Sequence, residues 1–162
     1  FAKAHGGDYV EVIGSGRGGS PAALQGREHM TTIPSTKIAA KAAYDMAGIT
    51  AKDVDFAEVH DCFTIAEVVD TEDLGFFGKG QGIQAIREDR TKLNSDISIN
   101  PSGGLKSKGH PIGATGVGQV VEVFDQLTGK AGARTVKDAK IGLTHNFGAT
   151  GASCAVHVFQ SV

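Results

Sequence analysis

The sequence contains few cysteines, no block of basic residues and no long apolar run. The two cysteines, Cys62 and Cys154, are far apart, so neither a disulfide framework nor a metal site is predicted, and a reducing cytoplasm is the expected compartment. The net charge is −2, and without a basic cluster neither nucleic acid nor an anionic membrane is expected as a partner. No segment is long and apolar enough to cross a bilayer, and the start shows no signal-peptide pattern.

Glycine, in contrast, is abundant, with 23 of the 162 residues. The apolar share of 40% and the charged share of 21% are ordinary for a globular protein, and the length suffices for one domain with a sizeable core. The glycines cluster at 14–19, 75–82, 103–118 and 142–151, mostly beside apolar segments. We therefore expect them at tight turns and at close approaches between backbone segments.

The hydrophobic spacing predicts strands that alternate with helices. Predicted strands cover residues 9–13, 54–59, 97–100, 139–144 and 152–159; predicted helices cover 35–47, 64–74 and 113–127; residues 1–8, 17–33 and 75–96 are expected to be irregular. This order predicts one α/β domain with a mixed, mostly parallel five-stranded sheet and helices on its faces, in which the last two strands pair antiparallel.

Two of the predicted helices carry apolar residues at helical spacing. Ser35 is the predicted N-cap of the first, and Gly48 the predicted end. Its apolar face comprises Ile38, Ala39, Ala42, Ala43 and Met46. The apolar face of the last helix comprises Val117, Val120, Val121, Phe124 and Leu127. Such a face is typical of a helix that packs against a sheet.

Gly14, Gly16 and Gly19 match the spacing of a dinucleotide-binding fingerprint after a strand. The surrounding sequence does not support that function, because Pro21 and Gly26 interrupt the helix that should follow. No second strand with an acidic end follows about 20 residues on. We therefore interpret the glycines as a turn that ends the strand.

A first candidate site, His60-Asp61-Cys62-Phe63, stands where a predicted strand gives way to a helix. Ligands of open α/β sheets bind at the carboxyl ends of strands. His60 and Cys62 are two residues apart, so an extended chain points both to the same side. The start of a helix favours the thiolate form of Cys62. The alternative is a small core cysteine beside a hydrogen-bonded histidine.

The segments 100–104 and 109–116 form the strongest candidate site, because their glycines let backbone approach a ligand closely. Pro111 fixes the turn directly after His110 and places the histidine just before a helix. The positive end of that helix disfavours an imidazolium, so we expect a neutral His110. A neutral imidazole can accept a proton from a thiol or donate its N–H to an oxyanion.

The segment 145–151 is predicted to turn between the last two strands. Its backbone N–H groups could form an anion pocket, or it is a hairpin with a polar tip. Cys154 lies within a strand pattern and is interpreted as a core residue, and His5, His29 and His157 are assigned no function.

Residues Asn100–Gly116 read Asn-x-x-Gly-Gly-x-x-x-x-Gly-His-Pro-x-Gly-x-x-Gly, and with this pattern the chain resembles the C-terminal half of thiolases over nearly its whole length. Most thiolases carry Asn-Glu-Ala-Phe at the position of residues 60–63, and Cys-x-Gly at the position of residues 146–148. Both departures match sterol-carrier-protein-type thiolases and their archaeal and bacterial relatives.

The resemblance implies a role for each candidate residue. His110 would activate a nucleophilic cysteine and help to bind the thioester oxyanion, and His60 would replace the usual asparagine of that oxyanion hole. Cys62 would replace the acid/base cysteine that is missing after His145, with His145 as a further catalytic candidate. The oxyanion- and substrate-binding candidates are Asn100, Gly109, Phe147 and Gly148.

The implied reaction is the cleavage of 3-ketoacyl-CoA by free CoA, or the reverse Claisen condensation. Coenzyme A and acyl-CoA would be substrates, with no tightly bound cofactor and no metal. The nucleophilic cysteine would belong to an N-terminal half that is absent here, so this chain alone is expected to be inactive and to self-associate. The full protein is expected to be a homodimer or tetramer, and some relatives work with hydroxymethylglutaryl-CoA synthase and a small acyl-CoA-binding subunit.

Two alternatives remain. A ketoacyl synthase or hydroxymethylglutaryl-CoA synthase would share the fold, although synthases of the first kind favour His-Thr where this chain has His110-Pro111. A non-catalytic acyl-CoA-binding scaffold is the second alternative, but binding alone requires no thiol at Cys62.

Overall fold

The structure, a computed structural model, describes residues 6–162, so His5 and the first part of the predicted irregular segment 1–8 lie outside the described residues. Five strands form one mixed sheet: β1 (Val10–Gly19), β2 (Phe56–Glu58), β3 (Ser98–Ile99), β4 (Ile141–Gly148) and β5 (Ser153–Ser161). The helices are α2 (Pro34–Ala47), α3 (Thr64–Asp73), α4 (Gly82–Arg87), α5 (Gly104–Lys108) and α6 (Thr115–Leu127). Short 3-10 turns lie at Leu24–Gly26, Ala51–Asp53, Gly132–Arg134 and Ala149–Gly151.

The strand order in the sheet is β1-β5-β4-β2-β3. β5 pairs antiparallel with both β1 and β4, whereas β2 pairs parallel with both β4 and β3. Within the described chain β5 therefore runs against the other four strands. This sheet confirms the predicted mixed α/β fold and the antiparallel pairing of the last two strands.

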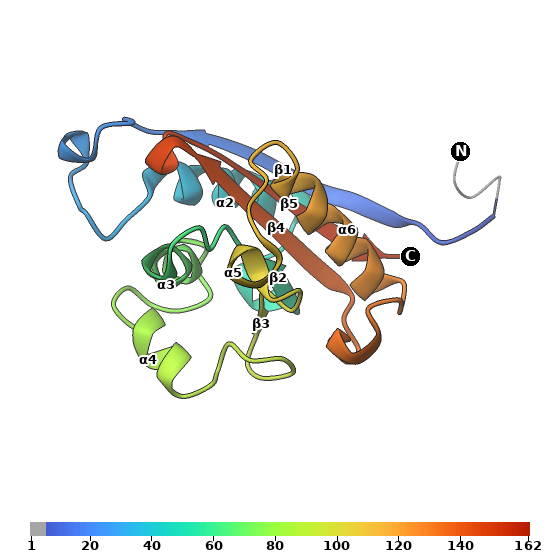
Figure 1. Ribbon diagram of the computed structural model, residues 1–162. Coiled ribbons are helices and arrows are strands. Elements are labelled where there is room, and N and C mark those ends of the chain that lie inside the picture. The colour runs from blue at the N-terminus through green and yellow to red at the C-terminus, as the bar shows by residue number, and fades with distance from the viewer. Residues whose placement is uncertain (1–5) are drawn as a thin grey trace.

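The sheet has helices on both faces (Figure 1). α2 packs on β1 and β5, and their buried side chains, among them Ala43, Val156 and Val158, form the larger part of the core. α6 packs mainly on β4, and a second cluster that includes Phe56, Val123 and Phe159 fills the space beneath it. No helix among residues 6–162 is long and apolar enough to cross a membrane.

The interpretation of the first glycine cluster as a turn was wrong, because β1 continues through it to Gly19 and residues 17–19 are not irregular. Gly14, Gly16 and Gly18 alternate along β1 and all face α2. A Cβ atom on any of them would overlap a backbone carbonyl oxygen of that helix. The glycines are therefore required because helix and strand backbones touch directly.

α2 differs from its prediction at its start and on its outer face. The N-cap is Ile33 rather than Ser35, whose hydroxyl instead donates to the carbonyl oxygen of Gly151 (2.6 Å). Ile38 and Met46, predicted on the apolar face, are exposed, and the small side chains of Ala39 and Ala43 make the contact with the sheet. The glycines of β1 leave room only for small residues on the inner face of this helix.

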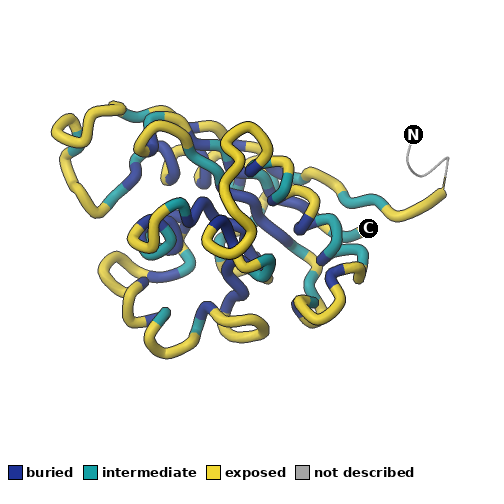
Figure 2. Tube along the Cα trace, viewed as in Figure 1, coloured by how far each residue is buried: buried dark blue, intermediate teal, exposed yellow. Residues whose placement is uncertain are grey.

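Part of the predicted apolar face of α6 is also uncovered. Val117, Val120 and Val121 are exposed, while Val123 is fully buried against the sheet. Ile112, just before this helix, is 87% exposed. Figure 2 shows exposed chain along α6 and along the loop that precedes it, on the side away from α2. The segment 75–96, expected to be irregular, contains the short helix α4.

Candidate active site

A cavity of about 860 Å³ lies beside α6 and the ends of β4 and β5. Segments that are far apart in the sequence meet there, since its lining runs from residue 60 to residue 157. Five predicted site residues line it: His60, Cys62, His110, Phe147 and Gly148. The other three candidates, Asn100, Gly109 and His145, are not among the lining residues.

His60 follows the end of β2 and is 4% exposed. Its ring centroid lies 4.9 Å from that of His110, with the rings edge to face, and 4.5 Å from that of Phe147. Burial, and next the proximity of His110, lower the pKa of His60 to about 4, against the opposing influence of Asp61 and Asn146. Nδ1 has no hydrogen-bond partner among residues 6–162. A neutral, buried ring with a free nitrogen suits a donor to an oxyanion.

Cys62 is half-buried in the same cavity, and its thiol does not behave as the helix-start argument predicted. Burial raises the pKa of the Cys62 thiol, and the carboxyl group of Asp61 raises it further. The backbone N–H of Phe63 and the ammonium of Lys106 oppose this rise without cancelling it. Desolvation therefore outweighs the effect of the helix start, and the resting form is the thiol.

His110 is exposed on the loop before α6. Its Nδ1 lies 2.7 Å from the hydroxyl oxygen of Thr115, and that hydroxyl also donates to the carbonyl oxygen of Pro111 (3.2 Å). With its single hydrogen directed at Pro111, the hydroxyl of Thr115 accepts from Nδ1–H of His110. Nε2 of His110 then carries a lone pair and can act as a base.

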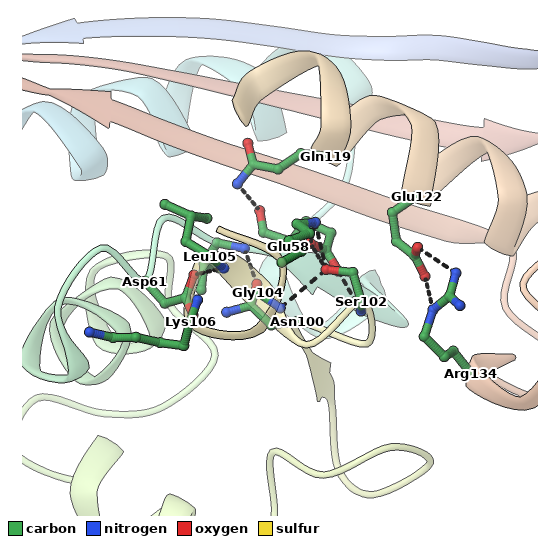
Figure 3. Close-up of polar contacts among 12 residues, drawn as sticks. Glu58, Asp61, Asn100, Ser102, Gly104, Leu105, Lys106, Gln119, Glu122 and Arg134 are labelled. Atoms are coloured by element: carbon green, nitrogen blue, oxygen red, sulfur yellow. Dashed lines mark hydrogen bonds and ion pairs between the residues drawn. The ribbon is translucent and has the colours of Figure 1, made fainter. Parts of the chain in front are cut away.

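Two buried carboxylates hold the loop that leads to His110 (Figure 3). Glu58 is fully buried and accepts from the backbone N–H (3.0 Å) and the hydroxyl (2.6 Å) of Ser102, and from Nζ of Lys108 (3.0 Å). Asp61 accepts from the N–H groups of Leu105 (2.7 Å) and Lys106 (3.4 Å) at the start of α5. The last residue of β2 and the second residue of the first motif thus fix the position of the glycine-rich loop.

Asn100, predicted to bind substrate, is engaged in the protein interior. Its Oδ1 accepts from the N–H of Val59 (2.8 Å), and its Nδ2 donates to Glu67 (3.3 Å). These contacts fix the backbone directly before His60. His60 therefore lines the cavity, whereas Asn100, which holds the backbone before it, does not.

His145 lies on the opposite face of the sheet from the cavity and is fully buried. Its Nε2 is 2.9 Å from the hydroxyl oxygen of Thr36 in α2, and its Nδ1 accepts from the backbone N–H of His60 (3.5 Å). Burial, and then the proximity of His60, lower the pKa of His145 to about 3. The expectation that the His145 side chain shares the cavity is therefore corrected.

Thr144, Asn146 and His157 line the cavity, although none was predicted as a site residue. The signal that could have identified the first two is strand parity: β4 extends to Gly148, so alternate residues face opposite sides of the sheet. Thr144 and Asn146 therefore face the cavity, whereas His145 between them faces α2. The side chain of Asn146 also opposes the lowering of the His60 pKa.

Comparison with known proteins identifies the family of this chain. A family model described as "Thiolase C-terminal domain-like" matches residues 16–161. The chain therefore belongs to the thiolase C-terminal domain-like family.

The relatives with similar sequences include archaeal and animal proteins. An acetyl-CoA acetyltransferase of Methanothermobacter thermautotrophicus is 49% identical over 151 residues, which are 93% of this chain and 39% of that protein. Sterol carrier protein 2 of Homo sapiens is 44% identical over 123 residues, which are 76% of this chain and 22% of that protein. The chain thus spans well under half the length of either relative.

A solved structure of the Ltp2-ChsH2(DUF35) aldolase superposes on the chain with a TM-score of 0.84 at 19% sequence identity. The match covers 95% of this chain and 40% of that one. At this identity the likeness shows a shared fold.

Proposed function

We propose that the chain is the C-terminal half of a thiolase that cleaves 3-ketoacyl-CoA with free CoA or catalyses the reverse condensation. The observation that carries the proposal is the convergence of His60, Cys62 and His110 on one cavity from three separate segments. A Claisen-type step needs a base, a proton donor for the α-carbon and donors to an oxyanion. These three side chains have the chemistry for all of those roles.

In the proposed cleavage, His110 accepts the proton of a nucleophilic cysteine supplied by the rest of the full-length protein. The thiolate attacks the 3-keto carbon and the C2–C3 bond breaks, so that an acyl-enzyme with the shortened chain forms together with the enolate of acetyl-CoA, and free CoA later removes the acyl group. The protonated Nε2 of His110 and the ring of His60 donate to the enolate oxygen. The thiol of Cys62 then delivers its proton to the α-carbon.

The raised pKa of Cys62 fits this direction of reaction, because cleavage requires a thiol that is protonated at the start. Condensation requires the reverse, a Cys62 thiolate that removes the α-proton. The backbone N–H groups near Phe147 and Gly148 are proposed to bind the oxyanion of the tetrahedral intermediate. A reducing cytoplasm would keep the thiol free.

The proposed N-terminal half docks on the apolar surface beside the cavity. Ile112, Val117 and Val121 are exposed along the loop and outer side of α6, and Val117 and Ile112 also line the cavity. A partner here would close the site and bring its cysteine towards His110. We also propose that the full protein forms a homodimer or tetramer. It would associate with hydroxymethylglutaryl-CoA synthase and an acyl-CoA-binding subunit.

The experiment compares Cys62→Ala and His110→Ala in the full-length protein, by trapping the acyl-enzyme from acetyl-CoA and by steady-state turnover. Cys62→Ala should still form the acyl-enzyme but lose turnover by about 10²–10⁴-fold, the contribution of a positioned acid/base. His110→Ala should lose both, because a base and an oxyanion donor disappear together. Cys154→Ala is the matched control, since Cys154 is buried beside Thr36 on the other face of the sheet.

Normal turnover of Cys62→Ala would rule out its acid/base role. CoA binding without acyl-enzyme formation or turnover in the wild type would instead favour the acyl-CoA-binding scaffold.

A further inference from the structure

Asp70 occupies the middle of α3 and is fully buried, yet neither carboxyl oxygen has a hydrogen-bond partner among residues 6–162. Buried polar groups are nearly always hydrogen-bonded, so an orphaned carboxyl group requires an explanation. The closest ring nitrogen is Nδ1 of His145, which lies 3.6 Å from Oδ2 of Asp70. A closer approach of about 0.6 Å would give an ordinary hydrogen bond.

The surroundings of Asp70 disfavour a carboxylate. Burial raises the pKa of Asp70 well above its ordinary value, and the acidic neighbours Asp73, Glu67 and Asp61 raise it further. The group facing it from β4 is His145, whose own burial keeps the ring neutral. A negative charge on Asp70 would raise the pKa of the two nearby thiols, Cys62 and Cys154. A charged Asp70 would thus be buried without a compensating cation from these groups, which is costly.

The hydrogen bonds around His145 define which of its nitrogens is an acceptor. The hydroxyl of Thr36 donates to Sγ of Cys154 (3.7 Å), so it accepts from Nε2–H of His145 (2.9 Å). Nδ1 of His145 therefore carries the lone pair. Two groups face that lone pair: the backbone N–H of His60 at 3.5 Å, and the carboxyl group of Asp70 at 3.6 Å.

We propose that Asp70 is a positioning residue, a neutral acid whose O–H shares the Nδ1 lone pair of His145 with the backbone N–H of His60 in a three-centre hydrogen bond, and that this buried group fixes the backbone at His60. The segment that it fixes carries His60 and Cys62 into the cavity. The proposal rests on the proposed function for the roles of those two residues. A neutral Asp70 also spares Cys62 a nearby negative charge, which would make its thiol still harder to ionise.

The test uses the full-length protein with Asp70→Asn and Asp70→Ala. An asparagine amide can donate to Nδ1 as the protonated acid does, whereas alanine cannot. We expect Asp70→Ala to lower kcat about 10²-fold with little change in KM, the cost of a misplaced catalytic group. Asp70→Asn should restore most of that loss. The infrared spectrum of the wild type should show the C=O band of a buried protonated carboxyl group, and this band should be absent from Asp70→Asn.

A second measurement is independent of catalysis. The rate of Cys62 alkylation is followed against pH by mass spectrometry of the peptide that contains it. Asp70→Asn should leave the midpoint unchanged, because it replaces one neutral group by another. If the midpoint of Asp70→Asn is lower than that of the wild type by about one pH unit, and the wild-type infrared spectrum shows no carboxylic acid band, Asp70 is ionised and the proposal is overturned.

Equal turnover of Asp70→Ala and the wild type would also overturn it, because the pair would then position nothing. If Asp70→Ala does not fold, the infrared band and the alkylation midpoint of Asp70→Asn still test whether Asp70 is protonated. Failure of the proposed function would be recognised by a different result, unchanged turnover of Cys62→Ala. The infrared and alkylation results expected for Asp70 do not depend on that outcome.

Discussion

Nδ1 of His110 lies 2.7 Å from the hydroxyl oxygen of Thr115, five residues further along the chain and 5% exposed. This contact joins the loop before α6 to the first residue of that helix. It fixes both the orientation of the imidazole and the nitrogen that carries the hydrogen. The base function proposed for His110 therefore depends on a side chain that is absent from the cavity lining.

Thr115→Val keeps the shape of this side chain but removes the hydroxyl, so the ring of His110 loses its orienting partner. We predict that acyl-enzyme formation in the full-length protein slows by about 10- to 100-fold, since misplacement of a catalytic group by about 1 Å costs this much. Rapid-quench measurement of the acylation burst provides the rate. Thr115→Ser retains the hydroxyl and should acylate at nearly the normal rate; an equal loss in both variants would contradict the assignment.

The contact between β1 and α2 predicts a large stability effect at one glycine. In Gly16→Ala the new methyl group would overlap the backbone of Ala39, which cannot move without displacing the helix. We expect a loss of about 3 kcal/mol in the free energy of unfolding, at the upper end for overpacking. Denaturant unfolding monitored by circular dichroism measures it.

Gly19→Ala in the same strand is the matched control. A Cβ atom at Gly19 would lie 3.8 Å from the carbonyl oxygen of Ala152, an ordinary contact. This variant should lose less than about 1 kcal/mol, because no close contact forms. Similar losses at the two positions would mean that backbone contact with α2 is not the reason for the glycines.

The exposed apolar side of α6 predicts how the isolated chain behaves. Exposed Val117 and Val121 should make it self-associate in solution, as large apolar patches do. The double variant Val117→Glu/Val121→Glu should be monomeric by light scattering and should fail to assemble with a co-expressed N-terminal half. Ile83→Glu, on α4 and also exposed, is the control and should behave as the wild type. A monomeric wild-type chain would contradict this prediction.

Buried neutral histidines predict sensitivity to acid. The folded-state pKa of His60, about 4, lies below the ordinary 6.5, so the unfolded chain binds more protons between these values. His60 therefore costs stability progressively as the pH falls from 6.5 towards 4, and none above 6.5. Asp70 acts in the opposite sense, because its pKa is raised. The effect of His60 is therefore measured as the difference in the free energy of unfolding between two proteins that both contain Asp70.

His60→Asn removes the titrating ring while keeping a polar side chain. We predict that the free energy of unfolding of this variant, relative to the wild type, rises by about 2 kcal/mol between pH 6.5 and pH 4.5. Thermal unfolding at a series of pH values gives the difference. A difference that stays constant with pH would show that His60 is not buried in its neutral form.

The α/β order and the antiparallel final pair could be predicted because local spacing carries that information, whereas a shared site for His60, Cys62 and His110 was expected only from the resemblance to thiolases. The errors arose where a residue's environment depends on distant chain. Gly14 and Gly16 could not be interpreted without the helix that touches them. The raised pKa of Cys62 comes mainly from burial by the segments that meet at the cavity. The side chain of His145 was assigned to the wrong face of the sheet, because the predicted strand ended at residue 144 whereas β4 continues to Gly148.

The pairing of β1 with β5 has a consequence for biosynthesis. β1 leaves the ribosome well before its hydrogen-bonding partner, Ser153–Ser161, which is made some 130 residues later. Until then α2 can cover one side of β1 while its edge stays open to other extended chains. We expect this interval to be the period when the nascent chain most needs a chaperone, and slow codons between α6 and β5 to lower the yield of folded protein.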